Sequence, residues 1–385
     1  MSDRLAVIQR LLTEAPADTV PERLADGLAK EYAVTDVALF LVDYRLSALM
    51  PLPGGEPVTH AGHPAWRSFD HQSEATDGNA VYLPVSIRGE RLGVLRCAPA
   101  PADPDVRGEL AEIATRLAHE LEGALAGTDR YTVAARTRRL TLAAEMQWEL
   151  LPGRSRIRPS FSLAGQLEPS YAVRGDSFDW AERGGRLSVS VLNGMGDGVE
   201  AALLTALATY ALRNARRAGV GLADQAALAD QAVFGLHHGT THVAALLLEL
   251  DLVSGEVQVV DAGSPQMMLL RDGMVHGQEF EAQFPLGMFE GSEYTPQSVA
   301  LARGDRLIIV SDGVSDAGAA EEHRYGDARL LRFVRRTRAM APLQAVRSLL
   351  GDLRSFVGDA DLDDDAVVVC LDWSGVPESG RPSTG

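Results

Sequence analysis

The pattern of hydrophobic and polar positions in the first third of the chain predicts a small mixed domain. Apolar residues recur at helical spacing in two stretches, and short apolar runs between them are typical of buried strands. The predicted elements, in order, are a helix over 20–32, a strand over 36–42, strands over 81–87 and 92–95, and a helix over 105–125. The Arg88-Gly89-Glu90 turn joins the last two strands into a hairpin, and the Pro-, Gly- and His-rich stretch 51–78 predicts a loop. Residues 1–126 are therefore assigned to a first domain.

Residues 127–153 carry a charged, amphipathic helical pattern that ends at Pro152-Gly153. Apolar side chains between Leu140 and Leu151 recur near helical spacing, so one side of the predicted helix is apolar. Two interpretations stay open: a linker helix packed on its neighbour, and a signalling helix or dimer seam. The pattern is too short to establish a coiled coil.

Residues 154–373 alternate predicted strands with helices and form a second domain. The strands are expected at 161–167, 187–192, 242–250, 256–261, 267–271, 306–310 and 367–371, and the helices at 199–217, 222–235, 327–338 and 343–357. A turn over 251–255 brings one strand back on the next, which predicts antiparallel pairing. Helices that cover both faces of the sheets give an α+β sandwich. The Pro-, Gly- and Ser-rich residues 374–385 predict a flexible tail.

Composition narrows the classes of function. The formal net charge of −17 argues against non-specific binding of nucleic acid or anionic membranes, because like charges repel. No apolar run approaches the roughly 20 residues of a membrane helix, and the first residues lack the pattern of a secretory signal. Cys97 and Cys370 each lie in an apolar run, which favours buried free thiols over a disulfide. We expect a cytoplasmic protein whose partners are proteins or small ligands.

Acidic residues lie next to glycines or strand ends in the second domain. They occur in Gly175-Asp176, in Ser311-Asp312-Gly313 after the strand over 306–310, and in Asp363-Asp364 before the strand over 367–371. A fourth segment of this kind, Asn193-Gly194-Met195-Gly196, has an amide in place of the acid. Carboxylates that converge in a fold bind hard divalent cations, which prefer oxygen ligands. The alternative is that Asp176 caps a helix, that Asp312 forms a turn and that the acids near 363 are solvated.

The first domain resembles a GAF domain, a small sensory module of bacterial signalling proteins. The resemblance depends on the order of its elements and on the phrase from Leu83-Pro84-Val85 to Gly93-Val94-Leu95. The family often binds a small ligand or dimerises, so a homodimer is left open and no ligand is named. Histidines at 60, 63 and 71 lie in the predicted loop, where solvated side chains are favoured over a metal site.

Residues 140–372 resemble the metal-dependent PPM (PP2C-like) protein phosphatases, and within them the bacterial branch of SpoIIE and RsbU. The matching phrases are residues 147–152, Val173-Arg174-Gly175-Asp176-Ser177-Phe178-Asp179, residues 193–202, Asp261-Ala262-Gly263, Pro285-Leu286-Gly287, Ser311-Asp312-Gly313-Val314-Ser315-Asp316, Tyr325-Gly326 and Asp363-Asp364. The resemblance implies an α-β-β-α sandwich. It also implies hydrolysis of phosphoserine or phosphothreonine with up to two Mn²⁺ or Mg²⁺ ions.

The resemblance assigns roles to particular residues. It makes Asp312 and Asp363 ligands of one ion, places Asp176 near the second and gives Gly194 a coordinating main-chain carbonyl. Asn193 stands where the family has the aspartate that bridges both metals, so Asp176 and Asn193 are the catalytic positions. An amide contributes no negative charge, which predicts weaker binding of the second cation.

Three more positions depart from the family pattern. Asp197 and Ser264 each stand where a histidine is common, and Asp197 is expected to offer a carboxylate. Arg174 replaces a glycine and is a candidate for binding substrate phosphate bidentately. The same arginine can instead pair with Asp176 or Asp179.

Two functions remain in view. The first is a serine/threonine phosphatase that hydrolyses a phosphorylated regulator, such as an anti-sigma-factor antagonist, with activity impaired by Asn193. The alternative is a pseudophosphatase that acts as a protein-binding regulatory module. In either case the first domain is expected to act as a sensor.

Overall fold

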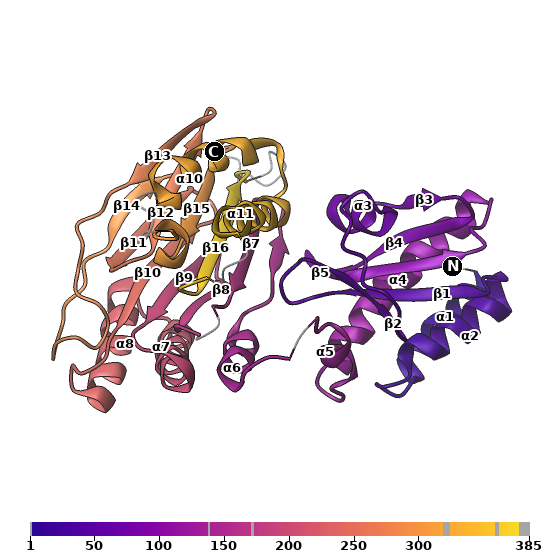
Figure 1. Ribbon diagram of the computed structural model, residues 1–385, viewed down its shortest axis with the longest axis horizontal. Helices are drawn as coiled ribbons and strands as arrows, with labels where there is room; N and C mark the ends of the chain where they lie inside the picture. The colour runs from indigo at the N-terminus through magenta and orange to yellow at the C-terminus, as the bar shows by residue number, and fades with distance from the viewer. Residues whose placement is uncertain (1, 138, 171–172, 319–323, 359–361, 377–385) are drawn as a thin grey trace, which may run out of the picture. The chain divides into compact units, whose positions relative to one another are not determined.

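The computed structural model of the chain describes residues 2–137, 139–170, 173–318, 324–358 and 362–376. It contains two compact units, Met1–Arg139 and Leu140–Gly385. Figure 1 shows the elements of each unit along the chain. No helix among the described residues is long and apolar enough to cross a membrane.

The first unit contains one antiparallel five-stranded sheet with helices packed on it. The elements are α1 (Asp3–Glu14), α2 (Val20–Tyr32), β1 (Asp36–Val42), β2 (Leu49–Leu52), α3 (Pro64–His71), β3 (Ala75–Asp77), β4 (Ala80–Ile87), β5 (Glu90–Ala98), α4 (Pro104–Ala124) and α5 (Arg130–Ala134). The strand order is β2-β1-β5-β4-β3. One continuous core joins α1, α2 and α4 to β1, β4 and β5. The predicted helix over 20–32 and the strands of the hairpin are confirmed.

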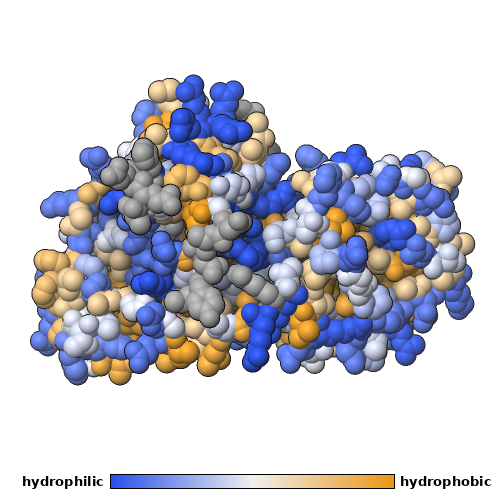
Figure 2. All heavy atoms as spheres, viewed as in Figure 1, coloured by the Kyte–Doolittle hydropathy of each residue, from blue (hydrophilic) through white to orange (hydrophobic). Residues whose placement is uncertain are grey.

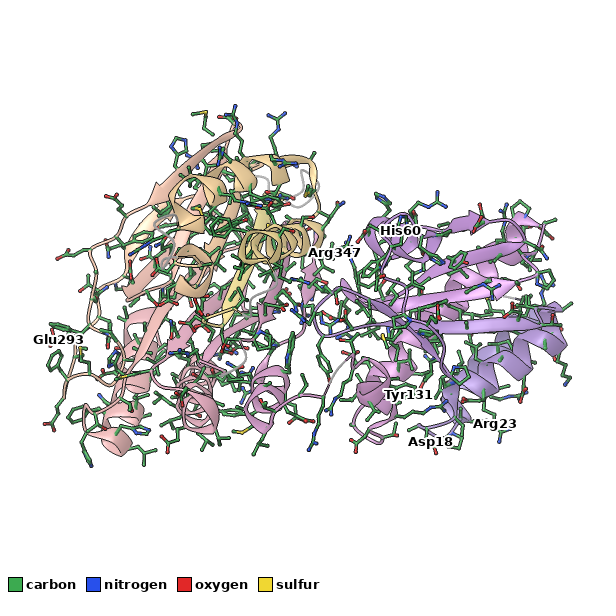
Figure 3. The ribbon with its side chains drawn as sticks, in the orientation of Figure 1. Asp18, Arg23, His60, Tyr131, Glu293 and Arg347 are labelled. Atoms are coloured by element: carbon green, nitrogen blue, oxygen red, sulfur yellow. The ribbon has the colours of Figure 1, made fainter. Side chains whose placement is uncertain are left out.

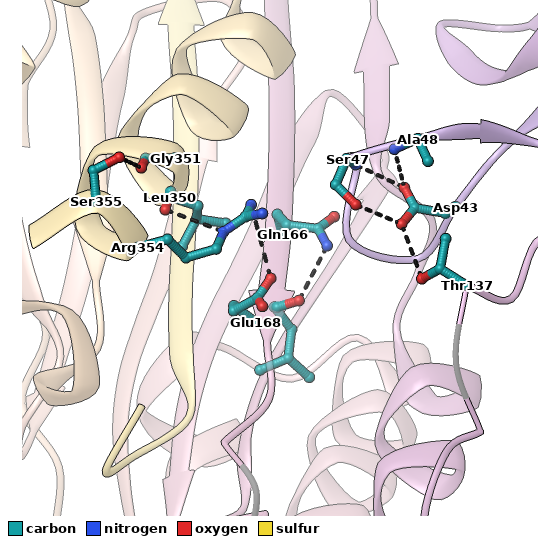
Figure 4. Close-up of polar contacts among 11 residues, drawn as sticks. Asp43, Ser47, Ala48, Thr137, Gln166, Glu168, Leu350, Gly351, Arg354 and Ser355 are labelled. Atoms are coloured by element: carbon teal, nitrogen blue, oxygen red, sulfur yellow. Dashed lines mark hydrogen bonds and ion pairs between the residues drawn. The ribbon is translucent and has the colours of Figure 1, made fainter. Parts of the chain in front are cut away.

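The turn from β1 to β2 is held by one buried carboxylate (Figure 4). Asp43 accepts hydrogen bonds from the backbone N–H groups of Ser47 and Ala48 and from the Ser47 hydroxyl. An ionised carboxylate that satisfies several donors favours one turn geometry over its alternatives.

The stretch 51–78 is more structured than its composition predicts, because it contains the end of β2, α3 and β3. The imidazole of His63 accepts a hydrogen bond from the Ala65 N–H at 3.1 Å and so caps α3. Pro64 at the first helical position fits the same start, since its missing N–H has no helical partner anyway.

The structure has two short helices where the sequence predicts one helical stretch over 127–153. They are α5 and α6 (Leu142–Leu150). The Thr141 hydroxyl accepts a hydrogen bond from the Ala144 N–H at 3.2 Å and starts α6 anew. Tyr131, which Figure 3 labels, holds α5 by donating a hydrogen bond to the Ala17 carbonyl. Arg130 pairs with Glu22.

The second unit contains two antiparallel sheets. The strands are β6 (Ser155–Ile157), β7 (Phe161–Glu168), β8 (Asp176–Arg183), β9 (Arg186–Gly194), β10 (Val243–Asp251), β11 (Glu256–Ala262), β12 (Gln266–Arg271), β13 (Met274–Gln278), β14 (Gln297–Ala300), β15 (Arg306–Val310) and β16 (Ala366–Trp373). The sheets have the orders β14-β11-β10-β9-β8 and β13-β12-β15-β16-β7-β6. Apolar side chains from both sheets share one core, so the two sheets pack face to face.

Helices cover the outer faces of the two sheets. They are α7 (Gly198–Ala218), α8 (Leu222–His237), α9 (Asp312–Ser315), α10 (Tyr325–Arg336), the 3₁₀ turn η2 (Thr337–Ala339) and α11 (Pro342–Val357). A second core joins α7 and α8 to β9, β10 and β11, and α11 packs on β7 and β16. The layers are therefore helix, sheet, sheet, helix. On α11, Arg354 lies 3.9 Å from the buried Glu168 of β7 (Figure 4).

Several apolar side chains remain exposed on α7 and α8, including Leu203, Tyr210 and Leu236. Figure 2 shows apolar atoms along the side of the second unit where these helices lie. Cys97 and Cys370 are buried free thiols, as the sequence predicts, and burial raises the pKa of each to about 12.

Candidate metal and phosphate site

Four strand ends bring the predicted acidic segments together in the second unit. Asp176 begins β8 and pairs in register with Asn193 near the end of β9. Asp312 follows β15, and the acidic run over 363–365 precedes β16, which pairs with β15. Gly313 allows the close approach of these two segments, because a Cβ there would lie 1.9 Å from the Asp365 carbonyl oxygen.

Asp365 is the hydrogen-bonding centre of this region, and the sequence did not single it out. Its Oδ1 accepts bonds from the backbone N–H and hydroxyl of Ser170 at 2.8 and 2.9 Å. Its Oδ2 accepts bonds from Gln147 Nε2 at 2.7 Å and from the N–H groups of Arg174 and Gly175 at 2.7 and 3.1 Å. A buried carboxylate with five donors is fully compensated. Asp365 therefore fixes the loop that presents Asp176.

Gln147 of α6 ties this helix to the same region. Its Nε2 donates to Asp365 and also to the main-chain carbonyl of Asp176 at 3.0 Å. The side chain is 1% exposed, so both bonds are shielded from water. The only sequence signal for this residue is the family phrase over 147–152.

Asp176 is fully buried, and neither of its carboxylate oxygens has a hydrogen-bond partner among the described residues. Burial raises its pKa well above the ordinary value, and the negative charge of Asp365 adds to this shift. The Ser311 hydroxyl offsets the shift in part, although that hydroxyl donates to the Asp365 carbonyl and accepts from the Val367 N–H. Buried carboxylate oxygens without donors are what a nearby cation stabilises.

Asp364, rather than the predicted Asp363, faces this group of acids. Burial raises the pKa of Asp364 to about 6, with Asp312 as the largest charged contributor. The side chain of Asp363 is exposed. Because the run Asp363-Asp364-Asp365 is acidic throughout, the sequence cannot tell which carboxylate the turn directs inward.

Asn193 forms a direct link to Asp312. Its side-chain Nδ2 donates to Asp312 Oδ1 at 2.7 Å and to Ser264 Oγ at 3.4 Å. The Gly313 N–H also donates to Asp312 Oδ1. The amide N–H of Asn193 therefore contacts the same carboxylate oxygen that could otherwise bind a metal ion.

The glycines near Asn193 are required for close packing. A Cβ at Gly194 would lie 2.2 Å from the Thr205 hydroxyl of α7. That hydroxyl donates to the Gly175 carbonyl at 2.6 Å, and the Gly194 N–H donates to the same carbonyl at 3.1 Å. The segment before β8, the turn after β9 and α7 are thus held as one rigid group.

Two of the remaining predicted residues have exposed side chains. Arg174 is exposed, and its charge lowers the pKa of Asp364 slightly. Asp197 is exposed and precedes α7 without a side-chain capping bond. Asp179, the alternative partner for Arg174, instead binds Arg213 and Arg216 at 2.9 and 3.0 Å.

The residues of the site offer only carboxylate, amide and main-chain oxygens, which are the ligand types that hard divalent cations prefer. The unsatisfied oxygens of Asp176 support the fit. Within the described part of the chain, however, no three His, Cys, Asp or Glu side chains are arranged to hold one metal ion. The bond from Asn193 to Asp312 accounts for part of this, because an acid at position 193 would supply the missing carboxylate.

Comparison with known proteins identifies sequences that are similar to the second unit. Residues 183–374 match the family model of stage II sporulation protein E (SpoIIE). The chain is 24% identical over 139 residues to the phosphoserine phosphatase RsbP of Bacillus subtilis (strain 168). That match covers 35% of this chain and 34% of the relative, so it spans about a third of the relative's length.

Two solved structures are similar to this chain. The RsbU and RsbW domains of Rv1364c from Mycobacterium tuberculosis superpose with a TM-score of 0.51 and 24% identity, covering 59% of this chain and 64% of that chain. A structure with the PP2C phosphatase domain and part of the regulatory domain of SpoIIE from Bacillus subtilis gives a TM-score of 0.49 and 19% identity, over 57% and 65% of the two chains. The second unit therefore shares its layered fold with the structure that contains these RsbU and RsbW domains.

Proposed function

We propose that this chain, whose second unit carries a SpoIIE-type, PP2C-like domain, is a metal-dependent protein serine/threonine phosphatase of bacterial signalling with activity reduced by Asn193. The observation that carries the proposal is that the strand ends with Asp176, Asp312 and Asp364 meet at one end of the two sheets. The match to a phosphoserine phosphatase supports the reaction class.

Asp312 and Asp364 are the residues proposed to hold a first Mn²⁺ or Mg²⁺ ion. Asp176 and the Gly194 carbonyl are proposed to hold a second, with Asn193 between them. Such ions lower the pKa of a bound water and neutralise charge on phosphoryl oxygens. Asp363, which the family resemblance suggested as a ligand, is replaced in this scheme by Asp364, because the Asp364 side chain lies next to Gly313 whereas that of Asp363 is exposed.

The chain's own residues orient these groups. Asp365 and Gln147 fix the backbone on both sides of Asp176. Thr205 fixes the glycines that carry the proposed carbonyl ligand. Arg174 stands exposed next to Asp364, where its guanidinium can bind two oxygens of a substrate phosphate.

The proposed substrate is a phosphoprotein regulator, such as an anti-sigma-factor antagonist, in the cytoplasm. The first unit is proposed to act as a GAF-like sensor that controls the second. Both assignments follow from the family resemblance.

A second candidate function is favoured by one contact. The bond from Asn193 Nδ2 to Asp312 Oδ1 cross-links the two sheets without a metal. A domain closed in this way can bind a phosphoprotein without hydrolysing it, as a pseudophosphatase does.

The deciding experiment measures Mn²⁺-dependent hydrolysis of a phosphoserine peptide by the native chain, by Asn193→Asp and by Asp312→Asn. The proposal expects slow native hydrolysis that Asp312→Asn removes. A native chain that is inactive but becomes active with Asn193→Asp would establish the pseudophosphatase. Activity that is indifferent to Asp312→Asn would refute the proposed site.

A further inference from the structure

A polar cavity lies at the opposite end of β15 from the candidate site. It has a volume of about 880 Å³ and is formed by the β12–β13 turn, the segment before β15, the end of β16 and η2. β15 has five residues and so spans about 17 Å at roughly 3.4 Å per residue. The cavity is therefore separate from Asp312, which follows the other end of this strand.

Four arginines line this cavity in a chain whose net charge is −17. Two of them are neutralised: Arg271 pairs with Asp305, and Arg306 pairs with Asp372. The other two are Arg303 and Arg338, which are exposed. Neither pairs with a carboxylate among the residues that the structure describes.

Arg306 builds the wall of the cavity rather than its binding groups. It is buried, and besides Asp372 its guanidinium donates to the carbonyls of Thr337 and Met340 on both sides of Arg338. This anchors η2 to the sheet. The position of the Arg338 backbone is thus set by a buried ion pair beneath it.

Both unpaired arginines lie against glycine. A Cβ at Gly273 would lie 3.1 Å from Arg338 Nη1, and one at Gly375 would lie 3.7 to 3.9 Å from the stem of Arg303. Gly273 also has a φ of +78°, which other residues adopt at a cost. The glycine leaves room for the Arg338 guanidinium to lie against the β12–β13 turn.

We propose that this cavity, here called the arginine cavity, binds a small phosphate-bearing anion such as a nucleoside polyphosphate. Two guanidinium groups without carboxylate partners supply planar donors that match phosphate oxygens. The volume lies within the range of small-ligand sites. Among the described lining residues, Asp305 and Asp372 are paired with arginines. Asp272 opposes anion binding, since it lies on the exposed turn and its charge acts on Arg271.

The test uses the full-length chain and calorimetric titration with ATP and, separately, with inorganic pyrophosphate. EDTA is present throughout, so that the candidate metal site does not contribute. The proposal expects saturable binding of one ATP per chain. If pyrophosphate binds equally well, the phosphates alone are recognised; if ATP binds more tightly, the cavity wall also contacts the nucleoside.

Two double variants distinguish a specific binding site from general electrostatic attraction. Arg303→Ala with Arg338→Ala should weaken binding at least tenfold. Arg10→Ala with Arg23→Ala removes the same charge from exposed positions of the first unit and should change affinity less than twofold. Asp272→Asn should tighten binding, and this change does not depend on the arginine variants folding. No saturable binding of either ligand, or an equal loss in both arginine pairs, would overturn the proposal.

Discussion

Asn193 Nδ2 and Asp312 Oδ1 lie 2.7 Å apart and join the ends of two strands from different sheets. An N–H donor that contacts a carboxylate oxygen stabilises the ionised acid without adding charge to the site. The same two positions with two carboxylates would repel each other unless a cation lay between them. One side-chain atom thus decides between a closed metal-free site and a site that requires metal.

Asn193→Asp should restore cation binding. We expect the affinity for Mn²⁺ to rise at least tenfold, or ~1.4 kcal/mol, because the new carboxylate adds charge and removes the competing donor. Calorimetric titration of the native chain and the variant measures the change. The metal-free variant should also be less stable than the native chain, and an unchanged metal affinity would contradict the role given to this position.

Asp364→Asn should remove Mn²⁺ binding, whereas Asp363→Asn should leave it nearly unchanged. The reason is that Asp364 lies against Asp312, while the Asp363 side chain is exposed. The two variants remove the same charge from adjacent residues, so each controls for the other. Equal losses of affinity would return Asp363 to the ligand set.

Asp365→Asn should lower the free energy of unfolding by about 3 kcal/mol. The variant replaces one acceptor oxygen by an NH₂ group, which would face the N–H donors that now bind the buried carboxylate. Chemical denaturation of the metal-free protein measures the loss. Asp363→Asn is again the control and should change stability by less than about 0.5 kcal/mol, as is usual for exposed positions. A similarly small change for Asp365→Asn would show that the hydrogen bonds to Asp365 are not needed for stability.

Asp352→Asn should show a pH-dependent loss of stability. Arg329 lowers the pKa of Asp352, and the Tyr325 hydroxyl donates to the same carboxylate at 2.9 Å. A lowered pKa in the folded state gives stability that is complete above the ordinary value near 4 and is lost as pH falls through the lowered value. We expect a loss of about 1 kcal/mol at pH 7, because Arg329 is partly exposed and the pair is screened.

The difference in free energy of unfolding between the native protein and Asp352→Asn should therefore become smaller as the pH falls below 4. Denaturant melts at pH 7 and pH 3 measure both values. An equal difference in free energy of unfolding at both pH values would mean that the ionised pair does not stabilise the folded protein.

The sequence predicts the apolar strands of the second unit well. β15 and β16 are buried along nearly their whole length, so each appears as an unbroken apolar run. β8 was not predicted because Asp176, Ser177 and Asp179 interrupt its pattern, although all three are buried. Arg213 and Arg216 of α7 compensate the buried charge of Asp179, and no local pattern reveals such partners.

The candidate site was predicted in part for a similar reason. Family phrases placed Asp176, Asn193, Gly194 and Asp312 at strand ends, and the structure brings them together. The turn before β16 decides whether Asp363, Asp364 or Asp365 points inward, and the sequence of three identical acids does not contain that information. The bond from Gln147 to Asp365 joins residues 218 positions apart, which only the folded chain can show.

Gln147 also sets the smallest fragment that can fold on its own. α6 buries Trp148 and Leu150, and Arg213 donates to the Leu150 carbonyl at 2.6 Å. A truncation beginning at residue 154 would retain every acidic side chain of the site and yet remove one of the donors that Asp365 needs. An autonomous fragment of the second unit must therefore begin no later than Thr141, which starts the helix.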